Sequence, residues 1–256
     1  MLYFFIISLS LVFSIEAKVF FPKINKGEVK ISYPCEAISR IGKMESEQIT
    51  FYVKKIRPET QELIVRHRLR ETDQDFTLKY RKSSTGGAPS VDKELYDLLK
   101  ARDKAGEVKF KCEADVTFLP KGIELEQGCS LTTPTDFFTT DHSKFMQMVG
   151  ISVPINRPEL ASYQINSFSW KKDDDFFPKG ISLEKWSVKN SQGEELCILE
   201  ASAKFEVSPG DNLGLEALAA RSMKRLQEAF RPLLPDKAQG NKTGRVLAFL
   251  TSKSGF

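Results

Sequence analysis

The sequence predicts an α+β fold in which about eight antiparallel strands form a β-barrel or tunnel with a few helices outside it. Two observations carry this prediction. About eight segments alternate between apolar and polar residues, and the two best defined of them are joined by a tight turn. The helical patterns are few, lie between strands and have one apolar stripe each. Alternation with a period of two is typical of strands that bury one face, as in an antiparallel sheet or barrel.

The best defined strands form a predicted β-hairpin over 107–130. The first strand, EVKFKCEADVTF, is followed by a Leu-Pro-Lys-Gly turn and by the second strand, IELEQGCS. If the Pro and Lys are the two loop residues, opposite positions sum to 241, which fixes the register. Cys112 then faces Cys129, and Asp115 faces Glu126.

The four cysteines are predicted to form two disulfides. An even number of cysteines without any Cys-x-x-Cys spacing favours disulfides over a zinc or redox motif. Directly opposed residues of a hairpin have Cα atoms about 4.5 to 5.5 Å apart, which suits a disulfide. We therefore pair Cys112 with Cys129 and, by elimination, Cys35 with Cys197. The second bridge would tie an early strand to a late one, as a closed sheet requires.

The other strands and the helices follow from their periodicity. Clean alternation places strands at 27–35, 48–55, 63–70, 75–82, 181–188 and 196–207. Ser90 is predicted to cap a helix over 91–102, a second helix covers 213–231, and a short one covers 142–149. We expect these helices outside the sheet on its apolar face, which leaves the charged face in solvent or inside a barrel.

The N-terminus predicts export. Residues 2–13 are almost entirely apolar and are followed by a small-residue end, so 1–17 is predicted to be a signal peptide cleaved after Ala17. The apolar run is too short to span a bilayer comfortably, so the cleaved chain has no stable membrane span and is expected to be periplasmic or extracellular. An uncleaved anchor is the alternative, because no Lys or Arg precedes the run. The folded domain is then 18–235, and 236–256 is a polar, Gly-rich C-terminal tail able to dock.

Charge and motifs narrow the function classes. The net charge of +4 is mildly basic, which is weak support for an anionic partner. The sequence has only two histidines, which argues against a histidine metal site or a Ser-His triad. It also has no P-loop, dinucleotide fingerprint or Gly-x-Ser-x-Gly motif. We expect an anionic small molecule or polyphosphate as partner, and no nucleic acid.

Charged residues gather on single strand faces. Five cations, Arg66, Arg68, Arg70, Lys79 and Arg81, share one face of two neighbouring strands, which like-charge repulsion disfavours unless an anion is present. The hairpin carries acids on its polar face, Glu113, Asp115, Glu124 and Glu126. Both charged faces would be explained if the basic face bound phosphates and the acidic face bound a divalent cation.

With this pattern the chain resembles the CYTH or triphosphate tunnel metalloenzymes, whose eight-stranded antiparallel tunnel has a charged lumen. The resemblance extends roughly from Lys26 to Glu206. LRET followed by FTLKYRK looks like that family's pair of basic strands, and Lys111-x-Glu113-x-Asp115 is similar to its basic-x-acid-x-acid strand. At the start, the family's Glu-x-Glu-x-Lys is replaced by Lys26-x-Glu28-x-Lys30.

The resemblance implies roles for these residues. The cations would bind phosphate oxygens, namely Arg66, Arg68, Arg70, Lys79, Arg81, Lys30 and Lys204. The acids would hold Mg²⁺ or Mn²⁺ through oxygen ligands, namely Glu28, Glu113, Asp115 and Glu200.

Three functional hypotheses follow. The replaced first acid and the export signal favour a secreted CYTH-like domain that binds a polyphosphate-like anion or a partner without efficient catalysis. The first alternative is a metal-dependent hydrolase of tripolyphosphate or another phosphoanhydride. The second is a structural or carrier protein whose polar face is merely solvated.

Overall fold

The structure is a computed structural model that describes residues 19–37, 45–53, 61–82, 88–135, 138–151, 161–190, 192–207, 214–231, 233–237 and 239–251. The predicted signal peptide, 1–17, lies outside the described residues. None of the helices within the described ranges is long and apolar enough to cross a membrane.

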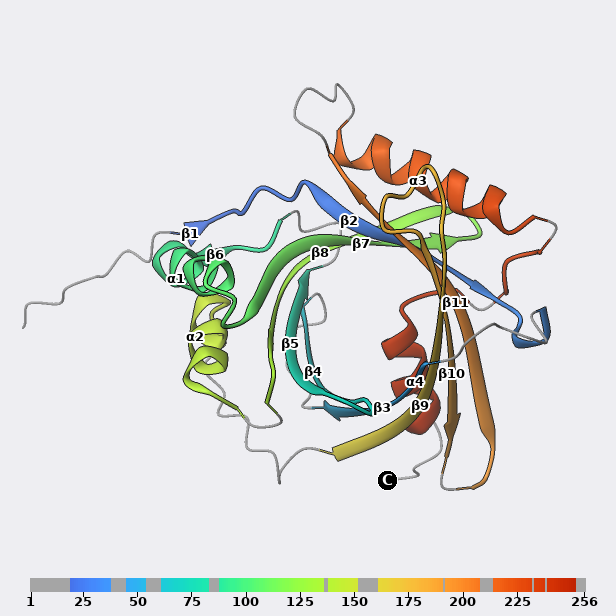
Figure 1. The fold of residues 1–256 in the computed structure, drawn as a ribbon, viewed down its shortest axis with the longest axis horizontal. Helices are drawn as coiled ribbons and strands as arrows, with labels where there is room; N and C mark the ends of the chain where they lie inside the picture. Colours follow the sequence, from blue (N-terminus) through green and yellow to red (C-terminus); the bar gives the residue numbers. More distant parts are fainter. Residues whose placement is uncertain are drawn as a thin grey trace, which may run out of the picture.

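Nine strands close into a barrel (Figure 1) in the order β10-β11-β2-β7-β8-β5-β4-β3-β9, and β9 pairs back to β10. The strands are β2 (Lys26–Tyr33), β3 (Glu45–Val53), β4 (Gln61–Leu69), β5 (Gln74–Lys82), β7 (Lys109–Leu119), β8 (Gly122–Thr133), β9 (Ala161–Lys172), β10 (Ile181–Lys189) and β11 (Glu195–Glu206). All neighbouring pairs are antiparallel except β2 and β7, which are parallel over Gly27–Lys30. The predicted α+β barrel is confirmed, with one more strand than the sequence indicated and one parallel pair.

The predicted hairpin register and both disulfides are confirmed. In β7 and β8, Asp115 lies opposite Glu126 and Cys112 lies opposite Cys129. Cys112 is bonded to Cys129, and Cys35 is bonded to Cys197. The second bridge joins a short 3-10 helix, η1 (Cys35–Ala37), which follows β2, to the start of β11.

Helices cover the outside of the barrel. They are α1 (Lys93–Lys104), α2 (Thr140–Met148) and α3 (Leu215–Ala229). Leu218, Met223 and Leu226 of α3 are buried in the larger apolar cluster, which lies between the helices and the outward faces of the strands and is called the outer core below. Phe230, just after α3, has its ring centroid 5.4 Å from that of Tyr33 in β2. This position of the helices is the one expected from their apolar stripes.

The start of α1 differs from the prediction. Residues Val91 and Asp92 form the two-residue strand β6, which pairs with β1 (Val19–Phe20), so the helix begins at Lys93. Asp92 is the N-cap, and its carboxylate accepts a hydrogen bond from the backbone N–H of Leu95 at 3.0 Å. Ser90 was the wrong cap because the extended pairing of the next two residues delays the helix.

The interior contains a second apolar cluster and a helix from the C-terminal segment. This helix, α4 (Lys242–Thr251), lies within the ring of strands in Figure 1. Its Val246 is fully buried, and Phe249 and Leu250 pack against the same cluster. The cluster also contains Ile49, Phe51, Ile64, Ile165, Trp186, Val188 and Ile198. Part of the segment predicted as a polar tail therefore packs inside the barrel.

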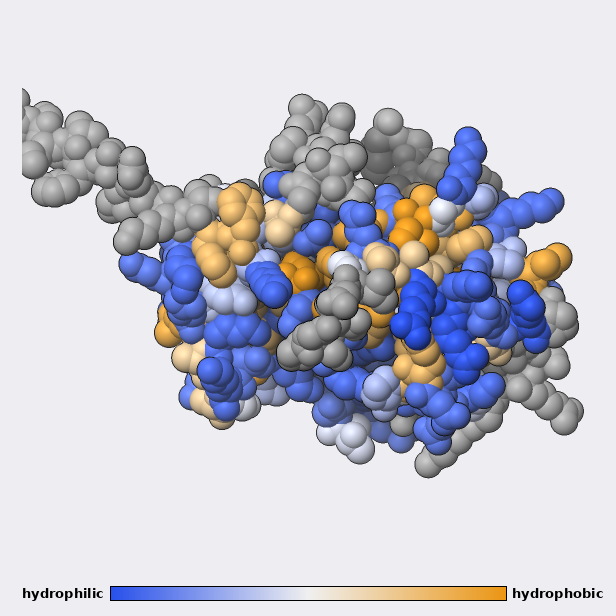
Figure 2. Space-filling model, turned by 90° about the horizontal axis from the view of Figure 1, so that it is seen from above, coloured by the Kyte–Doolittle hydropathy of each residue, from blue (hydrophilic) through white to orange (hydrophobic). Residues whose placement is uncertain are grey.

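The face that α3 crosses is mostly hydrophilic where it is coloured, and apolar side chains form small groups among polar ones there (Figure 2). The large apolar residues exposed in the described ranges are scattered along the chain, namely Phe21, Leu69, Leu98 and Leu234.

Candidate anion site in the barrel interior

The charged strand faces point into the barrel. Successive side chains of a strand face opposite sides, and the residues that alternate with these charges belong to the outer core: Phe76, Leu78 and Tyr80 in β5, and Ala114 and Val116 in β7. The same alternation turns Arg66 and Arg68 of β4 and Glu200 of β11 inward. The structure therefore brings together the predicted anion-binding cations on β4 and β5 and the predicted acids on the hairpin.

Asp115 is the centre of one interior cluster. Its carboxylate accepts from Lys30 Nζ at 2.8 Å, lies 3.0 Å from Arg81 Nε and also contacts Lys79 Nζ. Arg81 additionally lies 3.7 Å from Glu126. Asp115 and Arg81 are only 4% and 7% exposed, so this is a buried network and not a solvated surface.

Three cations around one carboxylate shift the pKa values of the cluster. Burial opposes ionisation of Asp115, but Lys30, Lys79 and Arg81 outweigh it and hold the pKa of Asp115 well below its usual range. Burial, reinforced by Arg81 and Lys30 and opposed by Asp115, lowers the pKa of Lys79 to about 8. Burial is the largest cause of this shift, and the contact with Asp115 offsets it only in part.

The arginines of β4 differ in their partners. Arg68 Nε lies 3.1 Å from Glu47 of β3, and Arg70 Nε lies 3.2 Å from the same carboxylate. Arg70 also pairs with Asp73 at 3.0 Å and Asp75 at 2.8 Å. Arg70 is thus matched by three acids at the end of the barrel.

Arg66 is the exception. Among the described residues, no carboxylate lies within ion-pair distance of its guanidinium, whose one hydrogen bond is to Thr77 Oγ1 at 3.4 Å. Its Nε is buried without a hydrogen-bond partner in the described chain. Burial and the neighbouring Arg68 lower the pKa of Arg66 to about 10, and the more distant charges of Asp75, Glu184 and Glu47 offset this only in part.

The four predicted metal ligands are each held by a lysine. Glu28 lies 3.4 Å from Lys30 and accepts from Ser202 Oγ at 3.1 Å. Glu113 pairs with Lys111, Asp115 with the cations described above, and Glu200 with Lys242 at 3.0 Å. No group of three or more potential ligands converges within the described ranges. Each predicted ligand is therefore already engaged in an ion pair in this structure.

Lys242, the first residue of α4, occupies the opposite wall of the interior. Its ammonium contacts Glu184 of β10, lies 3.0 Å from Glu200 of β11 and sits 4.3 Å from the centroid of the Trp186 ring. Burial opposes ionisation of Glu184, but Lys242 lowers the pKa of Glu184 to about 2. The helix is therefore anchored by an ammonium held between two carboxylates and an aromatic face.

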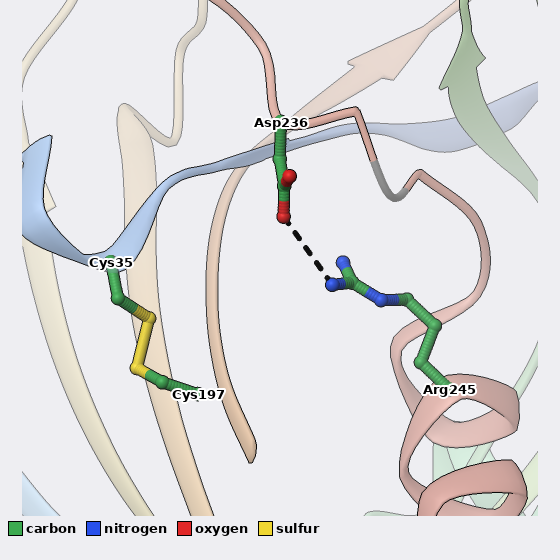
Figure 3. Close-up of a disulfide and its surroundings, with 4 residues drawn as sticks. All are labelled: Cys35, Cys197, Asp236 and Arg245. Carbon is green, nitrogen blue, oxygen red and sulfur yellow. Dashed lines mark hydrogen bonds and ion pairs between the residues drawn. A yellow bond between two sulfur atoms is a disulfide. The ribbon is translucent and has the colours of Figure 1, made fainter.

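The segment before α4 is fixed along β2. The backbone N–H of Asp236 donates to the carbonyl of Ser32 at 2.8 Å, and the Gln239 side chain bonds both the N–H and the carbonyl of Ser32. Arg245 of α4 reaches back to Asp236 at 3.4 Å, close to the Cys35–Cys197 disulfide (Figure 3). These contacts bond Ser32 near the end of β2, outside the part of the strand that pairs with β7.

Sequence reasoning missed three interior residues, Glu47, Glu184 and Lys242. Glu184 lies on a recognised strand, where its alternation with the outward Ile181 and Leu183 was the available signal. Glu47 lies just before the predicted start of its strand, and Lys242 comes from the presumed tail. Of the predicted cations, Lys204 is exposed at the end of β11, across from Glu28.

Comparison with models of protein families, with curated proteins and with solved structures gave no match to this chain. The function is therefore argued from the geometry of the interior.

Proposed function

We propose that the barrel binds an anionic, phosphate-like ligand in its interior without hydrolysing it. The observation that carries this proposal is Arg66, whose part-buried guanidinium has a buried Nε without a hydrogen-bond partner and no acid at ion-pair distance in the described chain. A buried donor without a partner and a desolvated charge that distant acids compensate only in part are both costly, so an anion that accepts from Arg66 would stabilise the folded protein. Two cations are placed to share it: Arg68, which lies two residues along β4 and acts on the pKa of Arg66, and Lys79, which pairs across from Ile64 on β5.

The lysines on the acidic residues support binding rather than catalysis. A hydrolase of the triphosphate tunnel type would need carboxylates free to hold a divalent ion. Here Glu28, Glu113, Asp115 and Glu200 each have a lysine partner. The charged, closed barrel supports the resemblance to the CYTH proteins as an architecture, while the acid set supports a non-catalytic member.

Export belongs to the same proposal. Two disulfides without free cysteines in the described chain favour an oxidising compartment. We propose that the chain is secreted through its N-terminal apolar segment and acts outside the cytoplasm.

Thermal unfolding of the protein with tripolyphosphate, with and without Mg²⁺ or Mn²⁺, tests the proposal when phosphate release is read from the same samples. We expect a rise in Tm that needs no metal, because a ligand that binds the native state stabilises it. We expect no phosphate release. A rise that needs metal and comes with release would establish the hydrolase instead, and no rise in any sample would leave the charges as a structural network.

A further inference from the structure

We infer that the ligand is an amphiphilic anion, with its head group on Arg66 and a single hydrocarbon chain along the apolar wall that α4 now covers. The head-group part of this inference rests on the proposed function. The hydrocarbon part rests on a separate observation, the apolar half of the interior.

The apolar wall is continuous and borders the arginines. Its side chains come from five adjacent strands, β4, β3, β9, β10 and β11. On β4, Ile64 is two residues before Arg66 and faces the same side. On β3, Phe51 lies directly opposite Arg66 and Ile49 directly opposite Arg68. A cationic site and an apolar surface that meet in this way match a charged head joined to an alkyl chain.

The cover on this wall is a weak helix. α4 has ten residues, shorter than the roughly 12 to 15 residues at which isolated helices become even marginally stable in water. Thr243, Gly244 and Val246 in its first turns have low helix propensity. Its position therefore depends on the packing of Val246, Phe249 and Leu250 against the wall and on the Lys242 anchor. A hydrocarbon chain that packs on the same wall would compete with these three side chains.

Gly244 offers a variant that strengthens the cover without touching the wall. A Cβ at this position would meet only the Asn241 Cβ, at 4.0 Å, so Ala fits without strain. Gly244→Ala should favour the helix because Ala has the higher helix propensity. If the hydrocarbon chain of the ligand and α4 compete for the wall, this variant must bind long-chain ligands more weakly than the parent. Its affinity for inorganic phosphate should equal that of the parent.

Trp186 reports directly on the cover. Its ring lies under the Lys242 ammonium and has its centroid 5.7 Å from that of Phe51. The other tryptophan, Trp170, packs against the outer core. In a Trp170→Phe background, displacement of α4 should therefore change the fluorescence of Trp186 alone.

The experiment titrates the full chain with inorganic phosphate and with butyl, hexyl, octyl and decyl phosphate below their micelle concentrations. We expect the affinity to rise about fourfold per methylene, which is ~0.8 kcal/mol, together with a change in Trp186 fluorescence. Arg66→Gln should lower the affinity for every member about tenfold. The matched control is Arg231→Gln, an exposed arginine after α3, which should change nothing.

The outcomes separate the two proposals. Affinity for alkyl phosphates equal to that for inorganic phosphate at every chain length would overturn the amphiphile and keep the anion site. If the affinity rises with alkyl chain length but is the same in the parent, Arg66→Gln and Gly244→Ala, the ligand adsorbs elsewhere on the protein. This result would also overturn the inference. Binding of neither phosphate nor alkyl phosphate would refute the proposed function together with it.

Discussion

The ammonium of Lys242, at the start of the C-terminal helix, lies 3.0 Å from the carboxylate of Glu200 in the middle of β11. This pair joins a segment near the end of the chain to the interior wall of the barrel. Glu200 is one of the acids predicted to hold a metal, and here its carboxylate is paired with an ammonium instead.

Lys242→Met should lower the free energy of unfolding by about 3 kcal/mol, because the buried Glu200 and the part-buried Glu184 would lose their cation. Urea unfolding measures the change. The matched control is Lys224→Met, an exposed lysine of α3, which should stay within about 0.5 kcal/mol of the parent. Similar losses in the two variants would contradict the anchoring role of Lys242.

Asp115→Asn should destabilise the protein by a similar amount, about 3 kcal/mol, because Lys30, Lys79 and Arg81 would lose their shared carboxylate. An anion in the interior would then replace the lost charge. We therefore expect tripolyphosphate to raise the Tm of this variant more than that of the parent or of the exposed control Asp173→Asn. A smaller rise in Asp115→Asn would argue that the ligand does not reach this cluster.

Tripolyphosphate binding should weaken above about pH 8, where Lys79 loses its proton because burial and the neighbouring cations depress its pKa. Below that pH Lys79 is already charged in the free protein. Above it, binding of the anion must be accompanied by protonation of Lys79. Calorimetry in buffers of different ionisation enthalpy should show this proton uptake. The Lys79→Arg variant keeps its positive charge, so its affinity for tripolyphosphate should not depend on pH in this range. If its affinity still falls above about pH 8, a group other than Lys79 titrates there.

Stability should fall as the pH drops from about 6.5 because of His142. Burial lowers the pKa of this fully buried residue to about 4 in the folded chain, although a backbone bond to Phe76 and the charge of Asp141 act against it. Between these two pKa values the unfolded chain binds a proton on His142 and the folded chain does not. The free energy of unfolding therefore falls by up to about 1.4 kcal/mol for each pH unit. The contribution is full above pH 6.5 and is lost towards pH 4.

Urea unfolding at several values between about pH 7 and pH 5 checks this, since few carboxylates titrate in that window. His142→Gln should have a flatter dependence of stability on pH than the parent. An equal slope would show that His142 is not the group responsible.

Local patterns were enough to predict the hairpin and both disulfides. The turn between β7 and β8 determines every pair of opposed residues, so the position of Cys112 across from Cys129 follows from counting. The inward charged rows of β4 and β5 were also readable, because each strand alternates cleanly over its length.

Strand β9 was missed because its apolar residues change sides along the strand. Ile165 faces inward onto the wall under α4, whereas further along Ser167 is inward and Trp170 packs against the outer core. A barrel whose interior is apolar in one part and polar in another produces this switch. Sequence alternation alone cannot show it, because it depends on which segment fills the interior.

The acids were predicted on the correct face, but their partners were not. Glu200 meets Lys242 only because α4 folds back inside the barrel, and Asp115 meets Lys30 only because β2 and β7 pair in parallel. Both contacts depend on long-range topology. The sequence therefore showed the acids but not the ion pairs that they form.

The most direct test of the central claim is calorimetric titration of tripolyphosphate, without any divalent metal, into the parent protein, Arg66→Gln and Arg231→Gln. We predict saturable binding to the parent and to Arg231→Gln, and about tenfold weaker binding to Arg66→Gln, since Arg66 is an interior cation with no acid at ion-pair distance in the described chain. Equal affinity of all three proteins, or no binding to the parent, would contradict an anion site in the barrel interior.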